Sequence, residues 1–323
     1  MATSSGGGTT EESQQSVLST LPSELPLDFL KSITDQFSQE RILGTGAFGT
    51  VYKGTLPGGE IIAVKKLSEN SPLPRERAFT NEVTNIMAVK HKNVVRLVGY
   101  CHEGLKKVVQ NNGRYIVADI VESLLCYEYL PRGNLQSNLF EIRTKMNWDT
   151  RFNIIKGICE GIHFIHSISV VHMDLKPQNI LLDDNLEPKI ADFGLSRFFG
   201  QEKTRMNTQT VVGSYGYMAP EYIYRGEIST KSDIYSLGIL IIETTTGEKN
   251  FCGNEPSAKR FVENVRTNWR GQRMLSEYPS LEADGLQQVT LCIEIGLQCV
   301  DIDRQKRPSI ETILDKLNGR HPN

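Results

Sequence analysis

The chain has 323 residues, of which 39% are hydrophobic and 23% charged, so it is long enough for one large domain or for two lobes with sizeable cores. Its formal net charge of −2, without a basic run, argues against nucleic-acid binding and against an electrostatic membrane patch. The six cysteines show no CxxC or metal-ligand spacing, which predicts reduced, buried thiols, and no apolar run is long enough to span a bilayer.

The first residues of the chain differ in composition from the rest. Residues 1 to about 20 are mostly Ser, Gly, Thr, Gln and Glu, so we expect them to be disordered. The following segment, LDFLKSITDQF, places Leu27, Leu30, Ile33 and Phe37 at helical spacing. It predicts a short helix that leads into the folded domain.

A GxGxxG pattern follows at Gly44, Gly46 and Gly49. A dinucleotide-binding loop with this pattern must open a helix. Here the next residues, 50–54, are β-branched and aromatic, and a Pro-Gly-Gly turn leads to the apolar run 61–65. The context favours antiparallel strands joined by a glycine-rich turn, in which backbone N–H groups can approach phosphates closely. The alternative is a plain flexible hairpin.

The run 61–65 also carries the first candidate ligand for a phosphate. Strand alternation puts Ala63 and Lys65 on one face and Lys66 on the other. Ala63 is small enough to lie over a flat base, and Lys65 would reach phosphates from the same face, whereas Lys66 is expected to be solvated. Glu82 lies in a segment with helical spacing and is a candidate partner for Lys65, although an isolated helical Glu is more often a surface residue.

Between Cys101 and Leu124, the pair Asn112-Gly113 separates two β-prone runs, KKVVQ and RYIV. This pattern predicts a hairpin with a two-residue turn. It is either an idle insertion or a docking surface, and the tolerance of loops to insertions favours the idle one.

A long helix is predicted after residue 147. Its apolar residues follow three- and four-residue steps, and its first turn begins at Asn147 or Asp149. His163 and His166 on this helix are expected to be structural. The apolar positions are Phe152, Ile155, Ile158, Ile162 and Ile165.

The densest polar cluster lies in the stretch VHMDLKPQNILLDDNLEPKIADFG, residues 171–194. Asp174, Lys176 and Asn179 precede a short apolar strand, and a return strand after an Asp-Asp-Asn turn delivers Asp192 beside them. Such oxygen ligands suit divalent cations, with one carboxylate left to meet a hydroxyl proton. Taken alone, the stretch would favour a solvated polar turn.

Downstream of this cluster, the segment 192–221 contains Thr204, Thr208, Thr210 and Ser214 as candidate phosphorylation sites, although loop hydroxyls are by default solvated. Thr230 and Asp233 then predict a capping box ahead of the hydrophobic helix IYSLGILIIE. Residues 257–317 are predicted to form helices separated by polar loops.

Together these motifs resemble the eukaryotic protein kinases. GTGAFGTV, AVK, a helical Glu, HMDLKPQN, DFG and MAPE occur in that family's order, over about residues 38 to 318. LLCYEYL, GSYGY and LQCVDIDRQKRP further resemble the plant receptor-like serine/threonine kinases. Because the sequence shows neither an ectodomain nor a transmembrane helix, it resembles a receptor-like cytoplasmic kinase or a fragment of a longer protein.

The resemblance implies an α+β fold with two lobes. A small antiparallel β-sheet lobe with one helix would span 38–128, and a larger, mainly helical lobe 131–318. Residues 1–37 would be a disordered segment with a short lead-in helix, and 319–323 a tail.

The resemblance also implies the cofactors ATP and Mg²⁺ and a role for each site residue. Asp174 would accept the substrate's hydroxyl proton, Lys176 would steady the transferred phosphoryl group, and Asn179 and Asp192 would hold the metal. Asp233 would brace the catalytic turn, and Glu221 would pair with Arg307. Tyr127 would be the gatekeeper, and the backbone of 128–130 would meet adenine. The implied nucleotide-binding residues are Leu43, Gly44, Thr45, Gly46, Ala47, Phe48, Gly49, Val51, Ala63, Lys65, Glu82, Tyr127, Glu128, Leu130 and Leu181.

One residue departs from the family pattern. Met173 stands where these kinases usually have an arginine that pairs with a phosphate on the activation segment, and a thioether can neither carry charge nor donate a hydrogen bond. The expected function is a protein serine/threonine kinase with modest basal activity. The alternatives are a pseudokinase acting as a scaffold and a small-molecule phosphotransferase. The expected partners are a protein substrate and an upstream receptor or kinase, and the expected location is cytoplasmic or peripheral at the plasma membrane.

Overall fold

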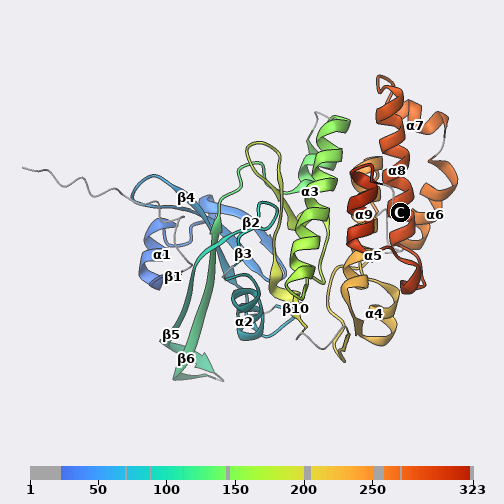
Figure 1. The fold of residues 1–323 in the computed structure, drawn as a ribbon. Helices are drawn as coiled ribbons and strands as arrows, with labels where there is room; N and C mark the ends of the chain where they lie inside the picture. Colours follow the sequence, from blue (N-terminus) through green and yellow to red (C-terminus); the bar gives the residue numbers. More distant parts are fainter. Residues whose placement is uncertain are drawn as a thin grey trace, which may run out of the picture.

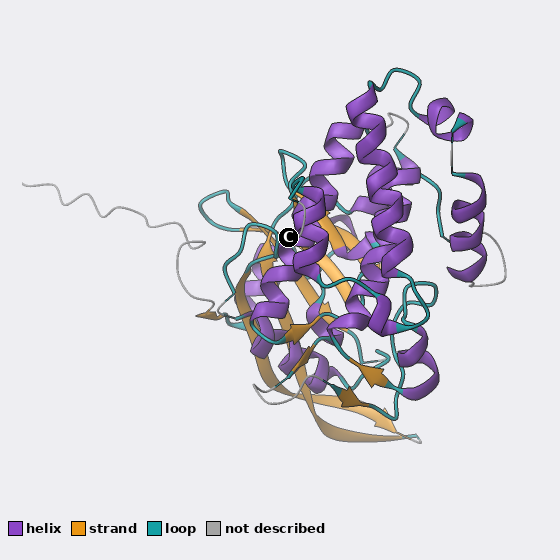
Figure 2. Ribbon diagram, turned by 45° about the vertical axis from the view of Figure 1, so that its right-hand side comes forward, coloured by secondary structure: helices purple, strands orange, loops and turns teal. Residues whose placement is uncertain are grey.

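The computed structural model describes residues 23–69, 71–87, 89–111, 113–142, 146–199, 205–250, 258–269 and 271–320. Strands gather at one end of the molecule and long helices at the other (Figures 1 and 2), so the predicted α+β, two-lobed architecture is confirmed. None of the helices in the described ranges has the length and apolar character needed to cross a bilayer.

The small lobe is built on a six-stranded sheet with the order β1-β5-β6-β4-β3-β2. Its strands after β1 are antiparallel neighbours, as the sequence predicts for the glycine-rich region. The elements are β1 (Ser23–Glu24), α1 (Leu27–Ile33), a 3-10 turn (Gln39–Arg41), β2 (Ile42–Gly46), β3 (Gly49–Thr55), β4 (Ile61–Leu67), α2 (Arg75–Ile86), β5 (Leu97–Asn111) and β6 (Arg114–Glu128).

The large lobe is mainly helical. Its helices are α3 (Trp148–Ser167), α4 (Pro220–Arg225), α5 (Thr230–Thr246), α6 (Ala258–Asn268), α7 (Gln272–Glu277), α8 (Ala283–Cys299) and α9 (Ile310–Leu317), with a short π-helix at Ser137–Glu141 and 3-10 turns at Pro177–Asn179, Phe193–Leu195 and Arg304–Lys306. Its short strands are β7 (Val170–Val171), β8 (Ile180–Leu182), β9 (Pro188–Ile190), β10 (Arg197–Phe198), β11 (Met206–Asn207) and β12 (Glu227–Ile228).

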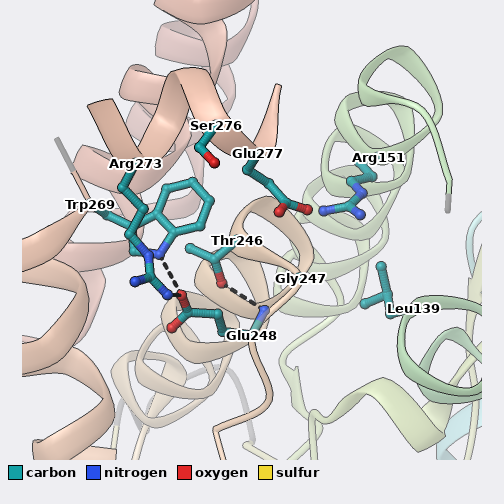
Figure 3. A pocket seen from close by; sticks show the side chains of 9 residues that line it. All are labelled: Leu139, Arg151, Thr246, Gly247, Glu248, Trp269, Arg273, Ser276 and Glu277. Carbon is teal, nitrogen blue, oxygen red and sulfur yellow. Dashed lines mark hydrogen bonds and ion pairs between the residues drawn. The ribbon is translucent and has the colours of Figure 1, made fainter. Parts of the chain in front are cut away.

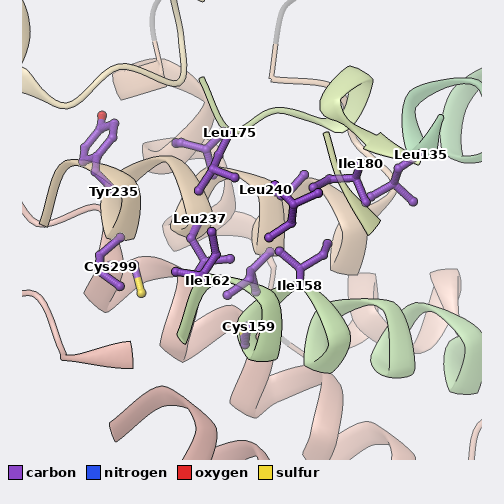
Figure 4. Close-up of a cluster of buried hydrophobic side chains, with 14 of the residues drawn as sticks. Leu135, Ile158, Cys159, Ile162, Leu175, Ile180, Tyr235, Leu237, Leu240 and Cys299 are labelled. Carbon is purple, nitrogen blue, oxygen red and sulfur yellow. The ribbon is translucent and has the colours of Figure 1, made fainter. Parts of the chain in front are cut away.

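The hydrophobic helix α5 runs through the centre of the large lobe. From Ser232 to Thr246 all of its residues are buried, and α3 and α8 pack on it through residues such as Ile158, Ile162 and Cys299 (Figure 4). The start of α3 follows the prediction, because the side chain of Asn147 accepts a hydrogen bond from the N–H of Thr150 at 2.9 Å.

The start of α5 corrects the sequence prediction. Thr230 and Asp233 do not form a capping box. The N-cap is Ser229, whose N–H donates to Ser232 Oγ at 3.2 Å and whose carbonyl oxygen accepts from the N–H of Ser232 at 2.9 Å. Both pairs have polar side chains three residues apart, so spacing alone cannot distinguish them. The shift by one residue leaves the carboxylate of Asp233 available for hydrogen bonds to the backbone of His172 and Met173, described below.

Helix α1 forms part of the small-lobe core instead of merely leading into it. Leu27, Leu30 and Ile33 are buried against the sheet, in a cluster that includes Val64 and Leu124. The helix ends at Ile33, four residues before the predicted end, because Asp35, Gln36 and Phe37 adopt left-handed backbone angles with φ of 51°, 57° and 56°.

Truncating Leu30 is expected to destabilise the small lobe. Its side chain is fully buried, so Leu30→Ala should lower the free energy of unfolding by about 2–5 kcal/mol. Ser32→Ala on the exposed face of the same helix should change it by less than about 0.5 kcal/mol. Urea denaturation of the two variants and the wild type checks the difference, and equal midpoints would show that α1 does not contribute to the core in solution.

The predicted hairpin between Cys101 and Leu124 is a continuation of two sheet strands. β5 and β6 stay paired from Leu97↔Tyr127 to Asn111↔Arg114, so the turn has the two residues predicted, and Gly113 has a φ of 79°. The resulting ribbon projects from the small lobe past α2 (Figure 1).

Candidate active site

Lys65 lies at the centre of a buried ion-pair network between the lobes. Its Nζ is 3.0 Å from Glu82 Oε2 on α2 and 2.7 Å from Asp192 Oδ1. Burial disfavours the charged amine, but the carboxylates of Asp192 and Glu82 outweigh it and raise the pKa of Lys65. Burial also disfavours the ionised form of Asp192, but the positive charge of Lys65 has the larger effect. The pKa of the Asp192 carboxyl is therefore lowered. The predicted pairing of Lys65 with Glu82 is confirmed.

Lys66 points to the opposite face of β4, as strand alternation predicts, but it is not simply solvated. Its Nζ lies 3.2 Å from Glu122 Oε2 and 5.0 Å from the centroid of the Phe37 ring. These partners lie far along the chain, so the sequence around Lys66 gave no signal of them. Lys66 therefore has a structural role away from the cleft.

Glu82 is held by two further groups that sequence reasoning missed. The buried hydroxyl of Tyr127 on β6 donates a short hydrogen bond to Glu82 Oε1, and the N–H of Phe193 donates to the same oxygen at 3.3 Å. Tyr127 is paired with Ala63 across the sheet, so its ring lies on the same face as Lys65. Glu82 thus links α2, the sheet and the segment after Asp192.

The hairpin of β8 and β9 brings Asp192 next to the catalytic turn, as predicted. Ile180 pairs with Ile190, and Asp183 Oδ1 accepts hydrogen bonds from the N–H groups of Asn185 and Glu187, which closes the turn. The N–H of Ala191 donates to Asn179 O at 2.8 Å. Asn179 and Asp192 therefore lie on adjoining segments.

Asp174 is surrounded by the groups that the sequence placed with it. Lys176 Nζ lies 2.8 Å from Asp174 Oδ2, and Asn179 Nδ2 donates to the same oxygen at 3.0 Å. Ser214 completes the cluster: its N–H donates to Asp174 Oδ1 at 3.1 Å, and its hydroxyl accepts from Lys176 at 2.6 Å. The carboxylate is 3% exposed and is held in one orientation.

Asp233 fixes the backbone of the catalytic turn. Its two oxygens accept hydrogen bonds from the N–H groups of His172 at 2.7 Å and Met173 at 2.9 Å, and His166 Nε2 lies 3.0 Å from Oδ2. Met173 has a φ of 71°, a left-handed conformation that a non-glycine residue rarely adopts. Asp233 stabilises this conformation, and the structural role predicted for His166 is consistent with its contact.

Asp192 shares this backbone feature, with a φ of 68°. Left-handed conformations of non-glycine residues cost free energy and cluster at functional sites. Here the two residues with this conformation, Met173 and Asp192, lie in the two segments that carry the candidate site residues Asp174, Asn179 and Asp192. Residue identity alone does not reveal such strain.

The predicted nucleotide-binding residues lie on the small-lobe sheet and α2, just after β6 and on β8. Val51 is paired with Lys65 and lies in β3, and Leu181 lies in β8 on the opposite lobe. Gly44 and Gly46 face open space, whereas a Cβ on Gly49 would lie 2.2 Å from Lys66 O, so only glycine fits there. The remaining predicted residues lie in β2, in the β2–β3 turn and at the end of β6: Leu43, Thr45, Ala47, Phe48, Glu128 and Leu130.

The donor set suits a divalent cation. The side-chain nitrogen of Asn179 donates hydrogen bonds to Asp174, so the side-chain oxygen of Asn179 is the atom left to bind a metal. Asp192 offers an ionised carboxylate as a second ligand. Oxygen ligands of this kind suit Mg²⁺. Across the described residues no group of three or more His, Cys, Asp or Glu side chains is arranged to hold a metal, so the two protein ligands would act together with phosphate oxygens.

The segment from Asp192 to Glu221 is anchored at its end by a bidentate pair. Arg307 donates to the two oxygens of Glu221 at 2.7 and 2.8 Å, as expected from the family resemblance, and both groups are buried. Thr210 is exposed and Thr208 is half-buried, while Thr204 lies outside the described residues.

A further buried carboxylate, Glu243 on α5, contacts this segment. Its oxygens accept hydrogen bonds from the Tyr217 hydroxyl and the Asn250 N–H, both at 2.8 Å. Burial raises the pKa of Glu243 to about 7, although both hydrogen bonds favour the ionised form. Sequence reasoning did not single out this residue, because it directly follows the apolar run that predicts the helix.

This pKa predicts a pH effect on stability. Between about pH 4.5, the ordinary pKa, and about pH 7, folded Glu243 retains a proton that the unfolded chain releases, so its contribution to stability falls as the pH rises through this window. The loss should be on the order of a few kcal/mol. Glu243→Gln, which cannot titrate, should be less destabilised between pH 5 and pH 8 than the wild type in urea denaturation. Parallel losses in both proteins would contradict the assignment.

A surface pocket lies elsewhere in the large lobe. It has a volume of about 330 Å³ and is lined by residues of α3, α5 and α7, with Arg151 and Arg273 beside Glu277 and Glu248 (Figure 3). Arg273 pairs with Glu248, and Arg151 donates to the carbonyl oxygen of Thr244. Because its guanidinium groups are engaged within the lobe and it contains none of the catalytic cluster, we do not assign it as the active site.

Comparison with known proteins agrees with this geometry. The protein kinase domain family matches residues 37–317. The chain is 40% identical over 305 residues to cysteine-rich receptor-like protein kinase 6 of Arabidopsis thaliana, covering 91% of this chain and 43% of that protein. It is also 40% identical over 309 residues to the G-type lectin S-receptor-like serine/threonine-protein kinase SRK of the same plant, covering 90% of this chain and 34% of that protein. The chain spans less than half the length of these relatives.

Proposed function

The chain belongs to the protein kinase family, and we propose that it transfers the γ-phosphoryl group of ATP to serine or threonine hydroxyls of proteins in plant receptor-linked signalling. ATP and a divalent metal are the general requirements of this domain. The observation that carries the proposal is the joint placement of Lys65, Asp174, Asn179 and Asp192 in one network.

Phosphoryl transfer depends mainly on positioning and charge neutralisation. Asp174, fixed by Lys176 and Asn179, is oriented to accept the proton of the attacking hydroxyl, and Lys176 would stabilise charge on the transferred group. Lys65 would bind the α- and β-phosphates. Mg²⁺, held by Asn179 and Asp192, would neutralise the charge on the phosphate oxygens.

The resemblance to serine/threonine kinases rests on Lys176 and Ser214. Both residues contact Asp174, and they also contact each other. The segment before MAPE therefore lies beside the carboxylate of Asp174, where a substrate hydroxyl would have to enter. The similarity to receptor-like kinases supports protein substrates and an upstream receptor as partners.

A phosphotransfer assay tests the proposal. The wild-type chain is incubated with Mg-ATP and a generic protein substrate, with Asp174→Asn as the control. Label on serine and threonine that Asp174→Asn abolishes is the expected result. Nucleotide binding without transfer would support the second candidate, a pseudokinase scaffold, which the uncharged Met173 favours. Label on small molecules alone would indicate a small-molecule phosphotransferase.

Met173 also predicts weak dependence on activation-segment phosphorylation. With no charge at this position, a phosphate on the segment lacks its usual partner. Alanine at Thr204, Thr208 and Thr210 together should lower the rate by less than about tenfold, or ~1.4 kcal/mol of barrier. The rate is measured after phosphatase treatment and re-incubation with ATP. A loss of about 100-fold would show that another cation, such as Arg197, has replaced the missing arginine.

A further inference from the structure

The side-chain amide of Asn85 links α2 to the segment that follows Asp192. Its nitrogen donates a hydrogen bond to Ser196 Oγ at 2.6 Å. The hydroxyl of Ser196 in turn donates to Phe193 O, also at 2.6 Å. Because a hydroxyl oxygen can accept and donate at the same time, Ser196 connects the helix amide to the backbone of the 3-10 turn Phe193–Leu195. We call the contact between Asn85 and Ser196 the latch.

The latch is a contact of the protein interior. Ser196 is fully buried, and Asn85 is half-buried. A buried hydroxyl costs free energy unless it is hydrogen-bonded, because water cannot reach it to replace a missing partner. Both roles of the Ser196 hydroxyl, as acceptor and as donor, are filled by groups of the protein.

A second amide of α2 contacts the same turn. Asn81 precedes Asn85 by four residues, so both lie on one face of the helix, and its side-chain nitrogen donates to Gly194 O at 3.2 Å. Glu82 accepts the N–H of Phe193 between these two contacts. Figure 1 shows α2 beside β10, the strand that follows the turn. Three successive polar side chains of α2 therefore bind the turn.

The other side of α2 is attached to the sheet by few apolar side chains. The buried residues of the helix are Ala78, Phe79, Glu82 and Ile86. The ring of Phe79 stacks on the ring of His102 on β5, with 4.7 Å between the ring centroids. A helix with so few buried apolar contacts is held only weakly by packing. Its position relative to the turn therefore depends on the polar contacts.

The turn itself also needs support. Asp192 directly precedes it and has the left-handed backbone conformation described above. Such conformations persist only where the surrounding structure restrains them. The carboxylate of Asp192 binds Lys65, so a movement of the turn would draw one carboxylate away from the shared cation. The latch lies where it restrains both Asp192 and the helix that carries Glu82.

We propose that Asn85 and Ser196 are positioning residues, which hold α2 and the turn together so that Glu82 and Asp192 both meet Lys65. The inference rests on the proposed kinase function, because its catalytic consequence is the rate of phosphoryl transfer. Neither residue belongs to the groups assigned to the nucleotide, the metal or the substrate hydroxyl. Their effect on the reaction passes through the turn and through α2.

Single and double variants test whether the two residues act as one unit. Asn85→Ala and Ser196→Ala should each lower kcat by about tenfold or more, because a displacement of about 1 Å at the reacting groups can cost about 100-fold. The double variant should lose no more than Ser196→Ala alone, to within about twofold. Losses that multiply in the double variant, or an unchanged kcat in both single variants, would overturn the proposal.

Thr84→Ala is the matched control, because Thr84 is adjacent to Asn85 on α2 but exposed. It should keep the kcat of the wild type, and KM for ATP should stay within about threefold of wild type in Asn85→Ala. A loss of kcat in Thr84→Ala as large as that in Asn85→Ala would show that any change in the helix lowers the rate, and the latch would be refuted.

Hydrogen exchange of the free chain tests the latch without phosphoryl transfer. In Asn85→Ala the backbone amides of residues 193–196 should exchange at least about tenfold faster than in the wild type, while the amides of α5 keep their protection and show that the chain is folded. Unchanged exchange at 193–196 would overturn the latch even in an active enzyme. A wild-type chain that transfers no phosphate would instead refute the proposed function, and faster exchange in Asn85→Ala would still support the latch.

Discussion

Lys65→Met is expected to lower the phosphotransfer rate by about 100- to 1000-fold, because it removes a fixed charge from the site where the phosphates of ATP would lie. The structure adds a second reason. Without Lys65, the buried carboxylate of Glu82 and the half-buried carboxylate of Asp192 lose their shared cation and repel each other. Steady-state phosphotransfer with Mg-ATP measures the effect.

Lys66→Met is the matched control, since the two lysines are adjacent in β4 but point to opposite faces. Lys66 contacts Glu122 and Phe37, so its loss should cost stability of about 1 kcal/mol or less and change the rate little. Thermal unfolding of both variants separates stability from catalysis. If Lys66→Met lowered the phosphotransfer rate strongly and Lys65→Met lowered it little, the assignment of the phosphate-binding lysine would be wrong by one residue.

Asp233→Asn should lower kcat by about 100-fold, although Asp233 is a positioning residue that does not touch the reacting groups. An amide has one acceptor oxygen, so it can satisfy only one of the N–H groups of His172 and Met173 and must present its NH₂ to the other. The turn would then shift, and a displacement of about 1 Å at the catalytic carboxylate can cost that factor.

The distinguishing measurement is the split between kcat and KM. KM for ATP should stay within about threefold of wild type, because the nucleotide contacts come from other segments. Asp184→Asn, in the exposed turn between β8 and β9, is the control and should behave as wild type. An Asp233→Asn enzyme that loses stability but keeps its kcat would show that Asp233 supports the fold alone.

Features governed by local pattern could be predicted from the sequence. The alternation in β4 places Lys65 and Lys66 on opposite faces, and the short β8–β9 hairpin brings Asp192 to Asn179. The Asn112-Gly113 turn gives the register of the whole ribbon. In each case the backbone geometry depends on residues close together in the chain, where side-chain period and turn chemistry are decisive.

What could not be predicted depends on contacts between distant residues. The Tyr127 hydroxyl reaches Glu82 across 45 positions, and Lys66 reaches Glu122 across 56. Residue spacing also cannot decide between two possible helix caps. At the start of α5, Ser229 and Ser232 form the cap in place of Thr230 and Asp233, although both pairs have the same spacing. In such cases packing selects among alternatives that are locally equivalent.

The position of Tyr127 has a consequence for chemical probes of this protein. Its buried ring lies on the Ala63 face of the sheet, so under the proposed nucleotide-binding role of this face, inhibitors that extend past an adenine-like core towards α2 would collide with it. Shortening Tyr127 would admit bulkier compounds, but it would also remove the hydroxyl that holds Glu82, and with it one restraint on Lys65. Under the proposed kinase function, a probe-sensitive variant would therefore be slower than the wild type, and a probe designed for the wild type would gain selectivity by remaining in front of the tyrosine.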